Sequence, residues 1–129
     1  MKRSFWSALL VVGGAALTLS ACDSGTFEEL DKAPLAFQHD SSKPRAQVVA
    51  CISGKLSKFG SDYGRFPDID FGVTRLTLGG EDGNHYRNYY RIDVIDEGHG
   101  SRVSVRHSKA VDNNMTVRDL SDIVEGCTG

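Results

Sequence analysis

The sequence predicts an α+β domain in which a three-stranded antiparallel sheet packs against an N-terminal and a C-terminal helix. Apolar residues recur every three or four positions in 44–59 and again in 116–127, which is the period of one helix face. Between these two segments, apolar and polar residues alternate along stretches that glycine-containing turns separate. A helix, a run of strands and a second helix favour a sheet with its helices on one face.

The first helix is expected between Pro44 and Phe59. The apolar positions of this segment have helical spacing: Val48, Val49, Ile52, Leu56 and Phe59. Ser41 or Ser42 can cap the start of the helix, and Gly60 can end it. Cys51 lies beside the apolar face, so its sulfur can reach the core side.

Three strands are expected to follow. Val, Thr, Leu and Phe are frequent in 71–78, which predicts a strand, but the imperfect alternation leaves its buried face open. The next two strands share one apolar face and predict a β-hairpin, with Gly98 and Gly100 in the connection. The alternating apolar residues of this hairpin are Tyr90, Ile92, Val94, Val103 and Val105.

A second helix is expected at the C-terminal end of the chain. Thr116 precedes Asp119 by three residues, which resembles a capping box. The apolar positions that follow at helical spacing are Val117, Leu120, Ile123, Val124 and Cys127. Gly126 is a plausible stop for this helix.

The N-terminal residues predict a secretory signal peptide. Lys2 and Arg3 form a short positive region, and 5–19 is almost wholly apolar. A transmembrane helix needs about 20 predominantly apolar residues, and this run falls short of that length. We therefore expect 1–21 to be removed rather than to remain as a membrane span.

The apolar run ends in Leu19-Ser20-Ala21-Cys22, which resembles the lipobox of bacterial lipoproteins. The resemblance implies that the Cys22 thiol carries a diacylglyceryl group, that cleavage occurs before Cys22, and that the new amino terminus is acylated as well. Two or three acyl chains anchor a protein stably to a membrane. The domain would then face the periplasm or the cell exterior. Asp23 resembles an inner-membrane retention signal of enteric bacteria, but that rule also depends on Ser24, so inner and outer membrane both stay open.

The lipobox also bears on the other two cysteines. With Cys22 assigned to lipid, Cys51 and Cys127 remain as a pair in an exported chain, so a disulfide is expected between them. This bridge would clamp the two helices together. The layout is similar to that of small bacterial envelope lipoproteins in which a helix cysteine and a near-terminal cysteine bracket a three-stranded sheet. That similarity implies a fold and no activity.

The domain organisation follows from these features. We expect 22–43 to be a lipidated flexible tether, because it is polar and broken by Pro34, and 44–129 to be one small domain. The formal net charge is −2 for the whole chain and −4 without Lys2 and Arg3. Nucleic acids are bound chiefly through clustered Lys and Arg, so this balance argues against a nucleic-acid partner.

The densest candidate for recognition lies on the predicted hairpin. Tyrosine and arginine dominate interface hot spots, because they offer large contact areas together with hydrogen bonds. If Tyr90 points inward, its neighbours share the outer face of the sheet with residues of the partner strand. The candidate interaction face consists of Tyr86, Tyr89, Arg91, Arg102 and Arg106, with Ser104 beside them. The alternative is that tyrosine fills the core edge while arginine covers apolar surface with its stem.

Chemical motifs are weak by comparison. His99 and His107 are weak metal candidates beside the acidic 96–97, but their spacing matches no compact ligand motif, and a solvated hairpin turn explains them as well. The chain has no Gly-x-Ser-x-Gly elbow. We therefore expect no enzyme and no cofactor, but a domain that binds an envelope protein as an inhibitor, immunity factor or assembly accessory. The alternatives are a module for cell-wall glycans or small ligands and, less favoured, a metal-dependent hydrolase.

Overall fold

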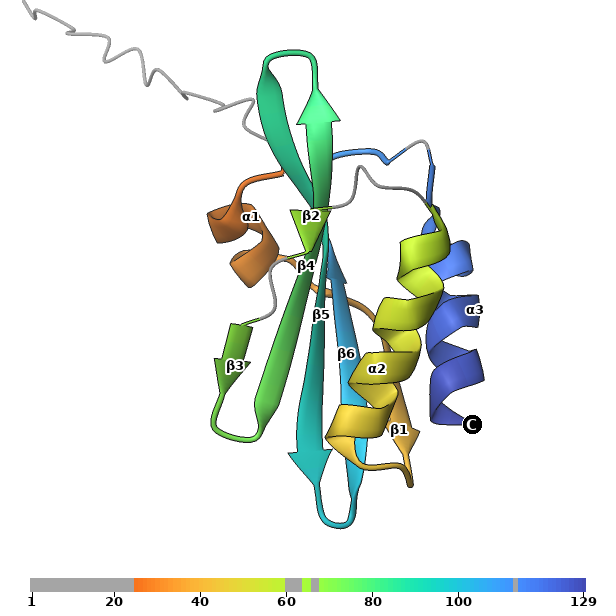
Figure 1. Cartoon of the computed structure of the whole chain (residues 1–129). Helices are drawn as coiled ribbons and strands as arrows, with labels where there is room; N and C mark the ends of the chain where they lie inside the picture. Colours follow the sequence, from red (N-terminus) through yellow and green to blue (C-terminus); the bar gives the residue numbers. More distant parts are fainter. Residues whose placement is uncertain (1–24, 60–63, 66–67, 113) are drawn as a thin grey trace, which may run out of the picture.

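The computed structural model describes residues 25–59, 64–65, 68–112 and 114–129. In these residues six strands form one antiparallel sheet in the order β1-β6-β5-β4-β2, and β3 also pairs with β4. Helices α2 and α3 lie on one side of this sheet and the short helix α1 on the other (Figure 1). The elements in chain order are α1 (Phe27–Lys32), β1 (Leu35–Ser41), α2 (Arg45–Leu56), the 3-10 helix η1 (Ser57–Phe59), β2 (Gly64–Arg65), β3 (Asp68–Asp70), β4 (Val73–Asp82), β5 (His85–Glu97), β6 (Gly100–His107) and α3 (Val117–Thr128).

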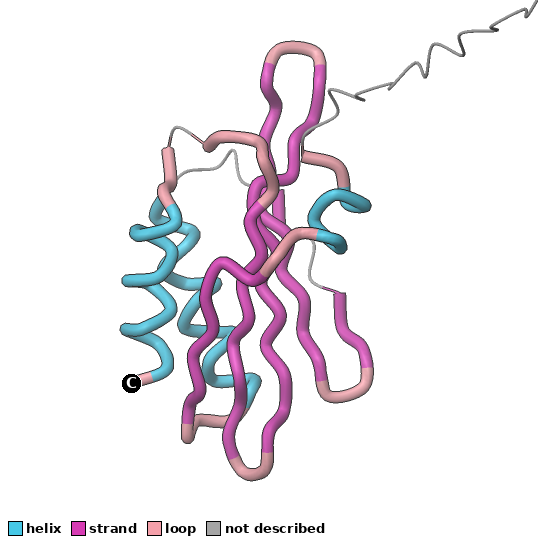
Figure 2. Tube along the Cα trace, turned by 180° about the vertical axis from the view of Figure 1, so that it is seen from behind, coloured by secondary structure: helices cyan, strands magenta, loops and turns pink. Residues whose placement is uncertain are grey.

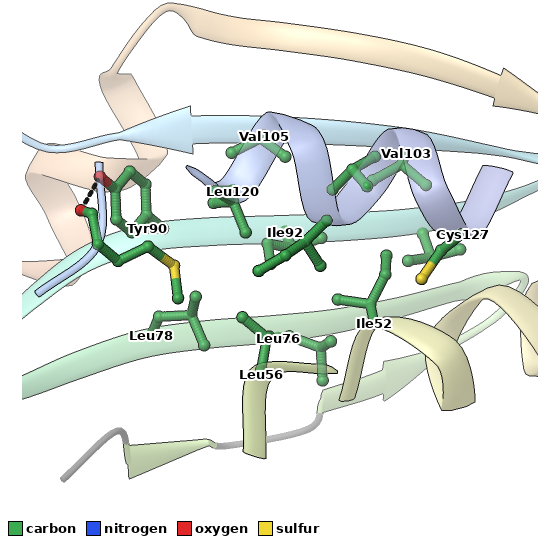
Figure 3. Packing of buried hydrophobic residues seen from close by; sticks show 14 of the residues in the cluster. Ile52, Leu56, Leu76, Leu78, Tyr90, Ile92, Val103, Val105, Leu120 and Cys127 are labelled. Carbon is green, nitrogen blue, oxygen red and sulfur yellow. Dashed lines mark hydrogen bonds between the residues drawn. The ribbon is translucent and has the colours of Figure 1, made fainter. Parts of the chain in front are cut away.

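The apolar core lies between the sheet and the two longer helices (Figure 3). β5 and β6 contribute the alternating residues that the sequence predicts, and each of these is at most 1% exposed. Leu76 and Leu78 of β4 are also buried in this cluster. The sequence pattern does not decide which face of this strand is buried, and in the structure it is the face that α2 and α3 cover. The helices contribute Val48, Ile52, Leu56, Leu120, Ile123 and Val124.

The predicted disulfide is present. It joins Cys51 of α2 to Cys127 of α3, with the two Cα atoms 5.7 Å apart. The bridge therefore ties the two helices together on the face of the sheet that they cover. The α+β class and the helix clamp are confirmed.

The helix ends differ in part from the prediction. Thr116 and Asp119 form the expected capping box, in which each side chain accepts a hydrogen bond from the other residue's backbone N–H. Gly126 does not end α3, which continues to Thr128. At α2 the N-cap is Pro44 without a side-chain bond. Neither predicted serine caps this helix: Ser41 belongs to β1 and its Oγ donates to the Thr128 carbonyl. Gly60 lies outside the described residues.

The prediction of a three-stranded sheet is wrong. Among the described residues, four strands are seven residues or longer, and the two short strands β2 and β3 extend the β4 edge. The strand expected over 71–78 begins at Val73 and continues to Asp82. β4 and β5 form a second hairpin, which was not predicted, and its register pairs Asp82 with His85 across Gly83 and Asn84.

The prediction of a flexible tether over 22–43 is also wrong where the structure describes it. Residues 27–32 form α1, whose Thr26 cap accepts a hydrogen bond from Glu29, and residues 35–41 form β1 along β6. Leu30 is 1% exposed, and Phe37 packs against the core. The short apolar run around Phe37 is thus a strand of the domain. A six-residue helix and an edge strand are too short for periodicity to show them clearly.

Candidate functional site

The candidate interaction face lies on the side of the sheet that bears α1. Register pairs Arg91 with Arg106 and Ile92 with Val105, so both arginines point away from the apolar core. Arg102 falls on the same outer side by alternation. Tyr89 lies where the β4–β5 register shifts, so alternation is interrupted there, and its side chain belongs to the buried apolar cluster. The register therefore places the three arginines together on one face, while Tyr86 lies beyond the register shift, in the part of β5 next to the β4–β5 turn.

The centre of this outer face is a network of ion pairs. Arg91 contacts Asp31 of α1 and also Asp93, whose carboxylate lies 2.9 Å from the guanidinium. The second oxygen of Asp93 accepts a hydrogen bond of 2.8 Å from Arg75. The side chains of Arg91 and Asp93 are 14% and 12% exposed. These two charges are therefore largely inaccessible to a partner protein, whereas the Asp31 side chain is 60% exposed.

The two remaining arginines are also bonded within the chain. Arg102 lies 2.8 Å from Asp40 of β1 and 2.7 Å from Glu97. The hydrogen bond from Arg102 holds the pKa of the Asp40 carboxyl below its usual value. Arg106 donates to the backbone carbonyl of Ala33, between α1 and β1. Each arginine of the candidate face therefore joins the sheet to the N-terminal segment.

The N-terminal segment covers the candidate face in part. Tyr89 is only 9% exposed, and α1 packs against β5 and β6. Of the five candidate residues, only Tyr86 is an exposed large side chain, at 43%. A glycan platform built from the same aromatics would lack the Tyr89 ring. Alternation gives the side of the three arginines, but it is interrupted at Tyr89, and it does not reveal that α1 and β1 lie beside the arginines.

The two histidines lie at opposite ends of β6. His99 is exposed in the β5–β6 turn, and the eight residues of β6 place His107 about 26 Å away at 3.3 Å per residue. His107 stacks on Tyr90, with ring centroids 4.7 Å apart. Burial raises the pKa of Tyr90 to about 12, and its hydroxyl donates to the Met115 carbonyl. His99 and His107 therefore do not form a metal site together, and the described residues hold no cluster of three potential ligands.

The exposed apolar side chains gather mainly near the ends of the sheet. We call "hairpin end" the end that carries the β4–β5 turn at Gly83, and "turn end" the opposite end with the β3–β4 turn at Gly72 and the β5–β6 turn at Gly98 (Figures 1 and 2). Phe71 is 102% exposed at the turn end. Other exposed apolar side chains are Phe27, Tyr86 and Val111, and also Leu35 and Phe59. Sequence reasoning singled out Tyr86 alone among these six.

A second surface feature lies between α2 and α3. An open groove there is lined by one lysine, two aspartates and two apolar side chains, namely Lys55, Phe59, Asp119, Asp122 and Ile123. Asp119 already serves the capping box, where the Thr116 backbone N–H and hydroxyl hold the pKa of its carboxyl below the usual value. The charges lining this groove are mixed, so they indicate no particular ligand.

Comparisons with known proteins give no relative from which a function could be inferred. The chain matches no model of a known protein family, no curated protein sequence and no solved structure. In the part of the chain that the structure describes, no helix has the length and apolar character needed to cross a membrane.

Proposed function

We propose that this chain is a lipid-anchored envelope protein whose domain binds another protein and catalyses no reaction. The lipobox-like sequence at Cys22 supports an anchor, and a domain closed by the Cys51–Cys127 disulfide suits an oxidising compartment outside the cytoplasm. A periplasmic or outward-facing location follows from the same two features. An inhibitor, an immunity factor or an assembly accessory would each use such a domain.

Phe71 is the observation that carries the protein-binding proposal. Its ring is 102% exposed in the β3–β4 turn, although a large aromatic side chain gains free energy when it is buried. The turn is held in place, because the Gly72 carbonyl accepts a 2.7 Å hydrogen bond from Asp96 of β5. Arg45 pairs with Asp96 at 3.1 Å. An aromatic anchor with charged groups around it has the composition of an interface hot spot.

Photocrosslinking in the native envelope tests this proposal. A photoreactive phenylalanine analogue at position 71 is expected to give one discrete adduct, and the same analogue at exposed Arg118 on α3 is the matched control. The partner identified in that adduct should bind the purified protein, and Phe71→Ser should weaken the binding about tenfold, a loss typical of a hot spot. The midpoint of urea unfolding should not change. Equal affinity of the Phe71→Ser protein, or no adduct specific to position 71, would contradict the proposal.

A further inference from the structure

The first described residue is fixed to the sheet. The Gly25 carbonyl accepts two hydrogen bonds from Asn88 of β5, from the backbone N–H at 2.8 Å and from the side-chain amide at 2.9 Å. The Gly25 N–H donates to the Glu29 carboxylate. Gly25 is buried at a φ of 86°, and a Cβ atom there would lie 3.1 Å from the Arg87 Cβ and 3.2 Å from the Ala110 Cβ. The folded domain therefore includes Gly25, and a residue with a side chain would be strained at this positive φ.

Very little chain separates this fixed point from the lipidation residue. Only Asp23 and Ser24 stand between Cys22 and Gly25. Three residue steps span at most about 11 Å, since consecutive Cα atoms are 3.8 Å apart. β5, with 13 residues at about 3.4 Å each, is roughly 44 Å long. The connection to an anchor at Cys22 is thus far shorter than the domain, and it cannot let the two ends of the sheet exchange places at a membrane.

Apolar, aromatic and basic side chains are exposed on the surface next to Gly25. Phe27 is 58% exposed two residues along the chain, and Tyr86 and Val111, next to the two residues that approach Gly25, are 43% and 75% exposed. Lys109 is exposed beside them, and Arg87 is half-exposed. Aromatic and basic side chains are favoured at the headgroup level of a bilayer.

We propose that the hairpin end rests on the lipid surface that holds the acyl chains of Cys22. Phe27, Tyr86 and Val111 contact the headgroup region there. The turn end, with Phe71, points away from the membrane toward a protein partner. This inference rests on the proposed lipid anchor. It adds that the anchor fixes which end of the domain a partner can reach.

Energy transfer on vesicles tests the orientation. The lipidated protein is reconstituted into phosphatidylethanolamine and phosphatidylglycerol vesicles that carry a headgroup-labelled acceptor. A donor dye is attached at Asn84→Cys in the hairpin end or, as the matched position, at His99→Cys in the turn end; both native residues are exposed. Transfer should be several-fold more efficient from position 84 than from position 99. Equal transfer from the two positions in protein that sediments with the vesicles would overturn the proposed orientation.

Two variants separate the causes. A 20-residue Gly/Ser insertion between Ser24 and Gly25 adds a root-mean-square reach of about 25 Å, so it should reduce the contrast between the two dye positions. An unchanged contrast would overturn the role of the short connection. With the native connection, Phe27→Ser combined with Val111→Ser should reduce the contrast partly, and no reduction would overturn the proposed apolar contact.

Mass spectrometry of the purified protein distinguishes failure of the orientation from failure of the anchor. The expected result is a diacylglyceryl mass on an N-terminal Cys22 peptide. If this mass is present and the two dyes transfer equally, the orientation is wrong and the lipoprotein proposal stands. If the mass is absent, both proposals are overturned.

Discussion

The two faces of the sheet are covered by different means. The inner face, beneath α2 and α3, is mainly apolar, and its five alternating apolar residues on β5 and β6 are at most 1% exposed. The outer face, beneath α1, is built from arginine and aspartate pairs such as Arg91 with Asp31 and Asp93. Apolar residues at regular spacing indicate burial wherever they occur, whereas a polar face is buried only if another segment happens to cover it. The alternation therefore predicts both the direction and the burial of the apolar side chains. For the polar side chains it predicts the direction but not whether another segment covers them.

The faces also differ in what they contribute to stability. Burial of apolar surface contributes roughly 25 cal/mol for each Å², so the inner face supplies most of the folding free energy. Ion pairs that are largely buried lose hydration when they form, so their net contribution to the folding free energy is small. Removing only one partner is costly, because the other charge is then left unpaired in a poorly hydrated place. The outer face should therefore contribute mainly to the placement of α1 and β1.

The largest expected effect concerns the clamp on the inner face. Cys51 and Cys127 are replaced by alanine in a mature chain that also carries Cys22→Ser. The unfolded chain then loses the cross-link between two positions that are 76 residues apart. The chain-entropy model gives a loss of about 4 to 5 kcal/mol in the free energy of unfolding for a loop of this length. Urea unfolding measures it, with Cys22→Ser alone as the control. A loss below about 1 kcal/mol would show that the helices need no clamp.

Truncation of one buried aliphatic side chain on each face compares the two coverings directly. Ile92→Ala on the inner face should lower the free energy of unfolding by about 3 to 4 kcal/mol, and Leu30→Ala, at the buried residue of α1, by about 2 to 3 kcal/mol. Both side chains are at most 1% exposed. Lys32→Ala, at a mostly exposed position of α1, is the control and should change little. A Leu30→Ala protein as stable as the parent would mean that α1 does not pack on the sheet.

The polar network should show smaller effects. Asp93→Asn leaves Arg75 and Arg91 without their shared carboxylate, which should cost about 1 to 3 kcal/mol. Asp31→Asn, at a side chain that is 60% exposed, should cost less than about 1 kcal/mol. Urea unfolding at low and high salt separates the two, because the exposed pair is screened more strongly. An equal loss of unfolding free energy for Asp93→Asn and Asp31→Asn would contradict the difference in burial between these two carboxylates.

The smallest expected effect is the loss of the capping box at α3. The Thr116 hydrogen bonds hold the folded-state pKa of Asp119 below 3.8, so their stabilisation is fully present above pH 3.8 and is lost as the pH falls through the folded-state pKa. Asp119→Ala should therefore be less stable than the parent at pH 6, and the difference should shrink at pH 3. A difference that is independent of pH would assign the stabilisation to a group other than the carboxylate.

Much of the inner half of the fold could be predicted from the sequence. The alternation of Tyr90, Ile92 and Val94 gave the buried face of β5, and the spacing of Thr116 and Asp119 gave the start of α3. The disulfide followed from counting cysteines once Cys22 was assigned to lipid. These features depend on local periodicity or on residue identity, which a single sequence displays.

The N-terminal segment of the fold, residues 25–41, and the candidate site could not be predicted in the same way. α1 has six residues and β1 pairs only at the edge, so neither gives a long periodic signal, and Pro34 between them suggested a linker. Their position is fixed by long-range contacts such as Arg102 with Asp40 and Arg91 with Asp31. Whether a face with tyrosine and arginine side chains is accessible to a partner depends on such contacts. The alternation of polar and apolar residues does not reveal them.

Hydrogen exchange tests most directly the claim that residues 25–41 belong to the folded domain and cover its outer face. The measurement is amide exchange of the mature protein, resolved by residue. The Asn88 amide, which donates to Gly25, and the bonded amides of β1 should exchange as slowly as those of β6. Exchange of the 25–41 amides at unstructured rates, while β5 and β6 stay protected, would contradict this claim.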